Sequence, residues 1–385
     1  MSRIDDLIAE MCPDGVEYIP LGDALKNGNA IDSVSKKDYK NVGAIPIIDQ
    51  SQAYIAGYTD HKSAIPPVLP CIIFGDHTRA VKYAEEIFAQ GDSGTKVFIP
   101  STDKFRIKFI YYSFCNLEIQ SRGYNRHWSI VKDMEIPCPP LQIQEEIVRI
   151  LDAFTTLEAE LEAELEARKK QYEYYRDELL TFGNDVEWKT LGEISTDIFR
   201  GSGITRDQVT VDGCPCVRYG EIYTTYNIWF DKCVSHTDPT KIQSKKFFEY
   251  GDILFAITGE NVEEIAKSCT YVGHDKCLAG GDLVVMKHNE NPKYIAYALA
   301  TRNAQEQKSK GKVKSKVVHS SVPALKNIRI PVPSLPEQAR IVEILDRFDA
   351  LINDITQGLP AEIAARRKQY EYYRDKLLSF KEKVS

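Results

Sequence analysis

Two stretches of the chain combine basic side chains with other residue types that are common in nucleic-acid contacts. Residues 121–128 read Ser-Arg-Gly-Tyr-Asn-Arg-His-Trp, and residues 308–317 read Lys-Ser-Lys-Gly-Lys-Val-Lys-Ser-Lys-Val. Arginine and lysine suit guanine edges, asparagine suits adenine, and lysines equally suit phosphates. The two stretches therefore predict DNA contacts of different chemistry, through the candidates Arg122, Tyr124, Asn125, Arg126, His127, Lys308, Lys310, Lys312, Lys314 and Lys316.

Both stretches also have a plainer interpretation. Polar, glycine-containing segments are common in solvated surface loops. Lysines that alternate with other residues are typical of an edge strand that is protected against pairing with other chains. The residue types alone leave these alternatives open beside DNA binding.

Further polar residues follow short apolar runs, where loops carry readout groups in many binding domains. They lie in residues 49–52, 75–79, 218–221 and 258–261. We expect these loops to supply additional DNA contacts, through Ser51, Gln52, His77, Thr78, Arg79, Arg218, Tyr219 and Asn261.

The distribution of charge bears on the kind of nucleic-acid binding. The formal net charge is −7, and residues 141–182 alone hold 11 acidic and 5 basic side chains. The remaining regions are close to neutral, so an electrostatic footprint must consist of local patches. This pattern disfavours a nonspecific nucleic-acid binder and leaves a sequence-reading protein open.

No motif for catalysis is present in the sequence. It contains no Asn/Asp-Pro-Pro-aromatic methyltransferase motif, no phosphate-binding Gly-x-x-x-x-Gly-Lys-Ser/Thr loop and no His-Glu-x-x-His. A nuclease-like fragment, Asp185 with Glu187 and Lys189, aligns with Glu17-Tyr18-Ile19, where the lysine is absent. The nine cysteines include no Cys-x-x-Cys pair. We expect a protein that is not an enzyme and that uses neither a cofactor nor a metal.

The elements that must position these residues occur twice. Residues 171–180 and 369–378 are identical at nine of ten positions, and residues 136–154 match residues 330–348 at an offset of 194. Residues 171–180 and 369–378 are related by an offset of 198, so the second copy is four residues longer. Repetition on this scale predicts a duplicated architecture with an internal pseudo-two-fold relation.

The repeated segments have a helical pattern. From Ile147 to Leu179 apolar residues recur every three or four positions, which predicts a helix with a narrow stripe suited to a coiled coil. The second copy offers a matching stripe, with an expected break in residues 356–360, where glycine and proline occur. We expect the two helices to pair antiparallel within one chain. Pairing with helices of other chains is the alternative.

The regions before each helical segment combine short β-branched and aromatic runs with one clear helix each, near residues 104–117 and 291–308. A further helix is expected over Met1–Met11. The class is α+β: two tandem α/β domains joined by two long helices that form an antiparallel coiled coil. The expected divisions are residues 1–140, 141–182, 183–335 and 336–385.

Apolar runs are too short for a membrane span, and the first residues lack a basic-then-apolar signal pattern. A cytoplasmic protein without a membrane partner is expected. This expectation agrees with a DNA partner.

The duplication carries a family resemblance. Two divergent globular regions, each followed by a similar helical segment that opens with Ile-Pro-x-Pro (Ile136 and Ile330), resemble the DNA-specificity subunit of type I restriction-modification systems. The resemblance covers the entire chain. It implies two target-recognition domains that each read half of a split double-stranded DNA target. It also implies conserved helices that dock two methyltransferase subunits and, through them, the restriction and translocase subunits.

A second class of function remains compatible with the residues. The chain has the features of a coiled-coil adaptor, whose globular domains would bind protein or carbohydrate. Binding to DNA of varied sequence in the presence of a methyltransferase partner distinguishes the two classes.

Overall fold

The computed structural model describes residues 3–183, 185–312, 317–353 and 358–383. The chain folds into two compact units. Unit 1 comprises Met1–Glu162 and Glu362–Ser385, and unit 2 comprises Ala163–Ala361. Each unit therefore combines one globular region with helical residues from both copies of the repeat. No helix in the described part of the chain has the length and apolar character needed to cross a membrane.

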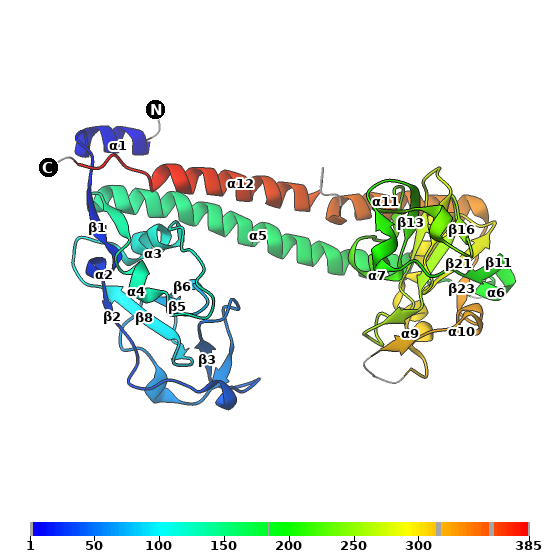
Figure 1. Cartoon of the computed structure of the whole chain (residues 1–385), viewed down its shortest axis with the longest axis horizontal. Helices are drawn as coiled ribbons and strands as arrows, with labels where there is room; N and C mark the ends of the chain where they lie inside the picture. Colours follow the sequence, from blue (N-terminus) through cyan, green and yellow to red (C-terminus); the bar gives the residue numbers. More distant parts are fainter. Residues whose placement is uncertain (1–2, 184, 313–316, 354–357, 384–385) are drawn as a thin grey trace. The chain divides into compact units, whose positions relative to one another are not determined.

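Unit 1 contains small β-sheets covered by short helices (Figure 1). Four strands pair in the order β2-β8-β5-β6, three in the order β4-β3-β7, and β1 pairs with β9. The strands are β1 (Glu17–Pro20), β2 (Leu25–Asn27), β3 (Ile45–Ile48), β4 (Gly57–Thr59), β5 (Cys71–Gly75), β6 (Val81–Ala84), β7 (Ala89–Gln90), β8 (Thr95–Pro100) and β9 (Glu135–Cys138). The helices are α1 (Arg3–Met11), α2 (Leu21–Ala24), α3 (Ile107–Cys115) and α4 (Trp128–Val131), with 3₁₀ turns at Lys36–Asp38 and Lys62–Ala64.

The central strand β5 is buried along its whole length, which explains its continuous apolar sequence. Its Phe74 ring lies 5.1 Å from the ring of Phe114 in α3, so this helix covers one face of the sheet. On the neighbouring strand Phe98 stacks on Trp128 of α4 at 4.1 Å. Aromatic packing of this kind buries a large area and fixes the positions of both helices.

Unit 2 has two larger sheets, in the orders β11-β21-β17-β19-β14 and β12-β15-β13-β20-β16, and the two-stranded pairs β10-β23 and β18-β22. The strands are β10 (Trp188–Thr190), β11 (Ser195–Arg200), β12 (Val209–Thr210), β13 (Cys214–Val217), β14 (Trp229–Phe230), β15 (Ser235–Thr237), β16 (Phe247–Phe248), β17 (Ile253–Ala256), β18 (Thr258–Gly259), β19 (Ser268–Tyr271), β20 (Cys277–Ala279), β21 (Leu283–His288), β22 (Val318–His319) and β23 (Arg329–Pro331). The short helices are α6 (Leu191–Ile194), α7 (Tyr219–Thr224), α8 (Pro292–Leu299), α9 (Arg302–Ser309) and α10 (Val322–Lys326), with 3₁₀ turns at Arg206–Gln208 and Pro239–Lys241.

The two units share one topology. The order β2-β8-β5-β6 of unit 1 corresponds to β11-β21-β17-β19 of unit 2, and β4-β3-β7 corresponds to β15-β13-β20. Even the parallel pairing of β3 with β7 recurs, between β13 and β20. The predicted α+β class and duplicated fold are confirmed, although little sequence identity remains between the two sheet regions.

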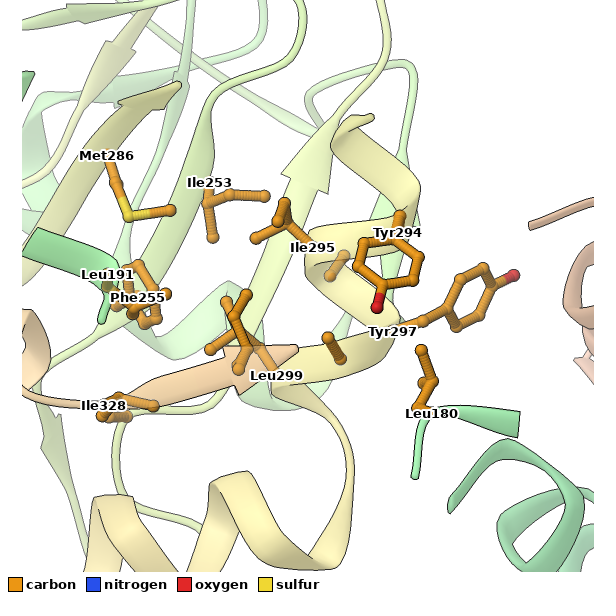
Figure 2. Close-up of a cluster of buried hydrophobic side chains, with 14 of the residues drawn as sticks. Leu180, Leu191, Ile253, Phe255, Met286, Tyr294, Ile295, Tyr297, Leu299 and Ile328 are labelled. Carbon is orange, nitrogen blue, oxygen red and sulfur yellow. The ribbon is translucent and has the colours of Figure 1, made fainter. Parts of the chain in front are cut away.

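The core of unit 2 lies between one sheet and α8. Figure 2 shows Tyr294, Ile295 and Leu299 of this helix facing Ile253, Phe255 and Met286 of the sheet. All six side chains are buried. The predicted helix over residues 291–308 is in fact two helices, because Thr301 ends the first and its side chain accepts a hydrogen bond from Ala304 N, which caps the second.

Three helices contain the repeated segments. Helix α5 runs without interruption from Leu141 to Leu179, as the apolar stripe predicted, and its first part belongs to unit 1 and the rest to unit 2. The second copy forms α11 (Leu335–Asn353) and α12 (Leu359–Leu377). The break expected in residues 356–360 lies partly in residues 354–357, which are outside the described residues, and Pro360 occupies the first turn of α12.

In unit 1, α12 packs against the first part of α5 (Figure 1). Phe154 stacks on Tyr373, with ring centroids 5.5 Å apart. Arg367 forms ion pairs with Glu158 and Glu162. Because contacts later in one helix meet residues earlier in the other, the two helices are antiparallel.

Unit 2 repeats this packing with the roles of the copies exchanged. Tyr175 of α5 stacks on Phe348 of α11 at 5.9 Å. These residues are the repeat equivalents of Tyr373 and Phe154. The same aromatic packing therefore occurs in both units. Each unit combines one helix from the first copy of the repeat with one helix from the second.

A half-buried aspartate fastens each helical segment to its globular region. Asp152 accepts a hydrogen bond from Tyr112 Oη at 2.6 Å and lies 3.1 Å from Lys108 Nζ. In the other unit, Asp346 accepts from Tyr297 Oη at 2.6 Å and lies 2.7 Å from Lys293 Nζ. Partly buried, charge-assisted bonds of this kind fix the orientation between elements.

A buried glutamine joins the start of each helix to the neighbouring loops. Gln144 is fully buried; its Nε2 donates to the carbonyl oxygens of Lys104 and Pro139 at 2.8 Å, and its Oε1 accepts from Arg106 N at 2.8 Å. In unit 2, Gln338 Nε2 donates to Pro333 O at 2.9 Å and to the carboxylate of Glu290 at 2.7 Å, and its Oε1 accepts from Asn291 N. These two glutamines satisfy backbone groups where the loops meet the helices.

Replacing Gln144 with alanine is expected to lower the free energy of unfolding of unit 1 by about 2–4 kcal/mol, because one buried and two partly buried backbone groups lose their partner. Gln142, on the exposed side of the same helical turn, is the control. Urea unfolding of both variants measures the difference. Equal stability of the two variants would show that the buried bonds contribute nothing.

Candidate nucleic-acid interface

Three of the predicted DNA-contact loops meet in unit 1. Gln50, at the end of β3, accepts hydrogen bonds from His77 N at its side chain (3.4 Å) and from Thr78 Oγ1 at its backbone carbonyl. Ser51 follows it, half-buried, and Gln52 is exposed. The loops over residues 49–52 and 76–79, which were predicted as separate contacts, therefore lie on one surface.

The segment of residues 121–127 is anchored to the same place. His127 is buried, and its Nδ1 lies 2.9 Å from the carbonyl oxygen of Asp76. Its Nε2 accepts from Arg122 N at 3.2 Å, and Trp128 N donates to Asp76 Oδ1 at 2.8 Å. These bonds match a neutral imidazole with its proton on Nδ1. His127 faces the interior and is removed from the set of DNA contacts, because both ring nitrogens hold the loop together.

The anchored loop exposes basic and aromatic groups. Tyr124 is 81% exposed and stacks on His77, with ring centroids 4.4 Å apart. Arg79 has a φ of 64°, which few residues other than glycine adopt, and its guanidinium donates to Ile119 O. Arg122, Asn125 and Arg126 are exposed, and the Asn125 amide donates to Arg122 O. The arrangement presents cationic and stacking groups on a preorganised loop.

In unit 2 the predicted residues lie in two groups. Strand β18 pairs with β22, which brings the loop of Asn261 next to the lysine-rich loop. Lys312 Nζ donates to His319 O at 2.7 Å, and Lys310 is exposed. Arg218 and Tyr219 form the second group, at the start of α7. Lys314 and Lys316 lie outside the described residues.

Lys308 is a second correction to the predicted set. It is 4% exposed, and its Nζ donates to Leu299 O at 2.8 Å and to Ser268 Oγ at 3.2 Å. Burial, together with repulsion from Arg176, lowers the pKa of the Lys308 ammonium to about 7. The side chain holds α9 against the sheet and is not available to DNA.

Comparison with known proteins assigns the chain to a family. The family model described as the type I restriction modification DNA specificity domain matches residues 13–167 and again 183–365. The chain is 36% identical over 409 residues to the type I restriction enzyme EcoR124I/EcoR124II specificity subunit of Escherichia coli, covering 99% of this chain and 97% of that protein. The chain belongs to the type I restriction-modification specificity family.

Other members of the specificity family share the length and the fold. A putative type I specificity subunit of Haemophilus influenzae is 28% identical, covering 95% of this chain and 96% of that protein. A chain in a solved structure of a type I restriction-modification system superposes with a TM-score of 0.61 at 14% identity, covering 94% and 97% of the two chains. The specificity subunit of M. genitalium gives a TM-score of 0.53 at 15% identity, covering 94% and 96%.

Sequence reasoning missed several polar residues beside Arg218. Arg206 and Asp282 line the same pocket as Arg218 and Tyr219 in this specificity-family fold. A sequence signal was present in the glycines at positions 201, 203, 280 and 281, which lie close to these two side chains along the chain. Their convergence depends on the pairing of β13 with β20 and of β11 with β21, which no local pattern reveals.

The lowered pKa of Lys308 generates a pH prediction. In the unfolded chain this lysine titrates near 10.5, whereas in the folded protein it titrates near 7, so between these values the unfolded state binds the additional proton. The stability of the wild-type protein relative to Lys308→Met should therefore rise as the pH increases from 7 to 10. Urea unfolding across this range measures the difference, with Lys310→Met as the exposed control. A flat difference would contradict the buried, neutral amine.

Proposed function

We propose that this chain is the DNA-specificity subunit of a type I restriction-modification complex, in which each unit reads one half of a split double-stranded DNA target. The observation that carries the proposal is the duplicated fold with different side chains at its loop ends. In unit 1 the loops after β3 and β5 carry Gln50, His77 and Arg79, whereas the loop after β13 in unit 2 carries Arg218 and Tyr219. Family membership supports the same conclusion.

The recognition domains would comprise residues 1–140 and 183–335, with the helical repeats over 141–182 and 336–385. Contacts in unit 1 would come from Gln52, Arg79, Arg122, Tyr124 and Arg126, which are exposed. In unit 2 they would come from Arg218, Tyr219, Asn261, Lys310 and Lys312. Exposed cations and an exposed ring on anchored loops suit base edges and phosphates.

The chain itself would catalyse no reaction. Among the residues that the structure describes, no group of three or more histidine, cysteine, aspartate or glutamate side chains is placed to hold a metal ion. Methyl transfer and cleavage would be functions of the partner subunits. The specificity chain would supply recognition and a scaffold for assembly, in the cytoplasm.

The helical segments would form one antiparallel coiled coil that sets the spacing between the half-sites. The antiparallel helix pairs inside each unit support this arrangement. Their outer faces carry the same exposed residues twice: Tyr174 and Tyr372 are 64% and 63% exposed, and each packs edge-on against the next tyrosine. Identical surfaces suit two copies of one partner. We assign them to two methyltransferase subunits, through which the restriction and translocase subunits join.

Exchanging residues 13–140 for the corresponding residues of a relative with another target should change one half of the DNA target and leave the other half intact, because each unit carries its own loops. Sequencing of methylated DNA from cells that contain the exchanged chain and its partners measures both halves. Wild-type chain is the control. A change in both halves would contradict independent reading, and the absence of DNA-sequence-dependent binding would favour the adaptor alternative.

Replacing Tyr174 with alanine should weaken the binding of one methyltransferase subunit by about 2 kcal/mol, since exposed aromatic anchors often dominate an interface. The double variant with Tyr372→Ala should weaken both subunits. Native mass spectrometry of a titration measures the number of partners per chain, expected to be two for the wild-type protein. Tyr250→Ala, which alters an exposed tyrosine outside the helices, is the control. Saturation of the wild type at one partner would contradict the proposal.

A further inference from the structure

Three loops of unit 2 enclose a pocket of about 390 Å³. The first loop follows β11, the second begins α7, and the third precedes β21. The polar side chains around the pocket belong to Thr205, Arg206, Arg218, Tyr219 and Asp282. All three loops lie at one end of the paired sheets, where the proposed function places DNA contacts.

Two glycines at this pocket are required neither by packing nor by backbone conformation. A Cβ atom added at Gly203 or Gly220 would meet no other atom within 4 Å, and neither residue has a positive φ. In contrast, a Cβ at Gly280 would lie 2.9 Å from Val217 O, so that glycine is required by packing. The open glycines allow a ligand to approach the backbone closely.

A buried carboxylate orients Arg218 at the pocket. Glu221 is 7% exposed, accepts from Ser235 Oγ at 2.6 Å, and accepts from Arg218 N at 3.1 Å. Its Oε1 lies 3.6 Å from Arg218 Nε. Within the described residues, the terminal guanidinium nitrogens of Arg218 have no hydrogen-bond partner. The Nε nitrogen is buried and makes no hydrogen bond, so Glu221 positions the guanidinium by charge, and the two terminal nitrogens are left for a ligand with two adjacent acceptors.

Asp282 adds an acceptor to the same pocket. Its Oδ1 accepts from Arg200 at 2.6 Å, which keeps the carboxylate in place beside the loop glycines. A carboxylate repels phosphate but accepts hydrogen bonds from an amino group. The combination of an oriented arginine and a fixed carboxylate matches a guanine, with acceptors at O6 and N7, paired with a cytosine, whose N4 amino group donates.

We infer that this pocket reads a G·C base pair in the half-site of unit 2, with Arg218 on guanine O6 and N7, Asp282 on cytosine N4, and Glu221 as the positioning residue for Arg218. The inference rests on the proposed function and specifies one of its contacts. Arg206, which is exposed at the rim, is suited to the adjacent phosphate.

The corresponding place in unit 1 has different chemistry. There Gln50, in the loop after β3, donates through Nε2 to Asp92 Oδ1 at 3.1 Å, and a Cβ at Gly94 would lie 2.4 Å from that amide. After β3, unit 1 thus has an amide side chain bound to a carboxylate, where unit 2 has Arg218 and Tyr219 after β13. The guanine contact should therefore belong to one half-site alone.

The test uses the chain assembled with its methyltransferase subunits and duplexes that carry the methylated target. The half-site of unit 2 is the half that survives the exchange of residues 13–140. Each guanine in that half, on either strand, is replaced in turn by 7-deazaguanine, which lacks the N7 acceptor. Wild-type complex should lose about ten- to a hundredfold in affinity at one guanine. With Arg218→Ala, affinity for the natural duplex should fall comparably, and the 7-deazaguanine substitution should have no further effect.

Gly220→Ala is the second variant, because its added methyl group has room in the folded chain and should leave the urea midpoint unchanged. It should nevertheless weaken binding to the natural duplex by blocking close approach. Lys232→Ala, an exposed cation outside the pocket, is the control. Retained sensitivity to 7-deazaguanine in Arg218→Ala, or no sensitive guanine in this half-site, would overturn the inference while selective DNA binding upholds the proposed function. Loss of all sequence-selective binding by the wild-type complex would instead overturn the proposed function.

Discussion

An apolar stripe along α5 must be covered by other helices, and this requirement determines how the chain is divided. Ile147 and Leu151 are fully buried in unit 1, where α12 supplies part of their surroundings, while Tyr172 is buried in unit 2 beside α11. A single helix with such a stripe is not stable in water without packing. Each unit therefore contains helical residues from both copies of the repeat. Asp152 and Asp346 join these helices to the globular regions of their units.

The sequence predicts the parts of this organisation that depend on repetition and period. The apolar spacing from Ile147 predicted α5, and the match between residues 136–154 and 330–348 predicted a duplicated architecture. Phe154 and Phe348 indeed pack on equivalent tyrosines. The division of the helix at residues 291–308 was missed because a single threonine cap, Thr301, decides it, and a cap is a local exception to an otherwise helical pattern.

The candidate interface was harder to predict because residue type does not reveal the direction of a side chain. His127 and Lys308 look like surface groups in the sequence, yet both face inward, where backbone carbonyl oxygens of distant residues accept their hydrogen bonds. The loops of Gln50 and His77 were predicted as separate contacts and share one surface. Arg218 and Asp282 line one pocket because of the pairing between strands, which no local sequence pattern predicts.

The composition of unit 1 from both ends of the chain has a consequence for synthesis on the ribosome. Its core includes Leu377 and Leu378, whereas the residues of unit 2 all lie between positions 163 and 361. The region made first is therefore completed last, after roughly 200 further residues, or about 10–40 s at translation rates of about 5–20 residues per second. During that time Ile147 and Leu151 lack their final covering from α12, so the nascent chain exposes an apolar helix face until shortly after unit 2 is completed at residue 361. The N-terminal region is thus completed after the region that follows it in the chain, which reverses the usual order of folding during synthesis. A chaperone would protect the exposed helix face during this interval.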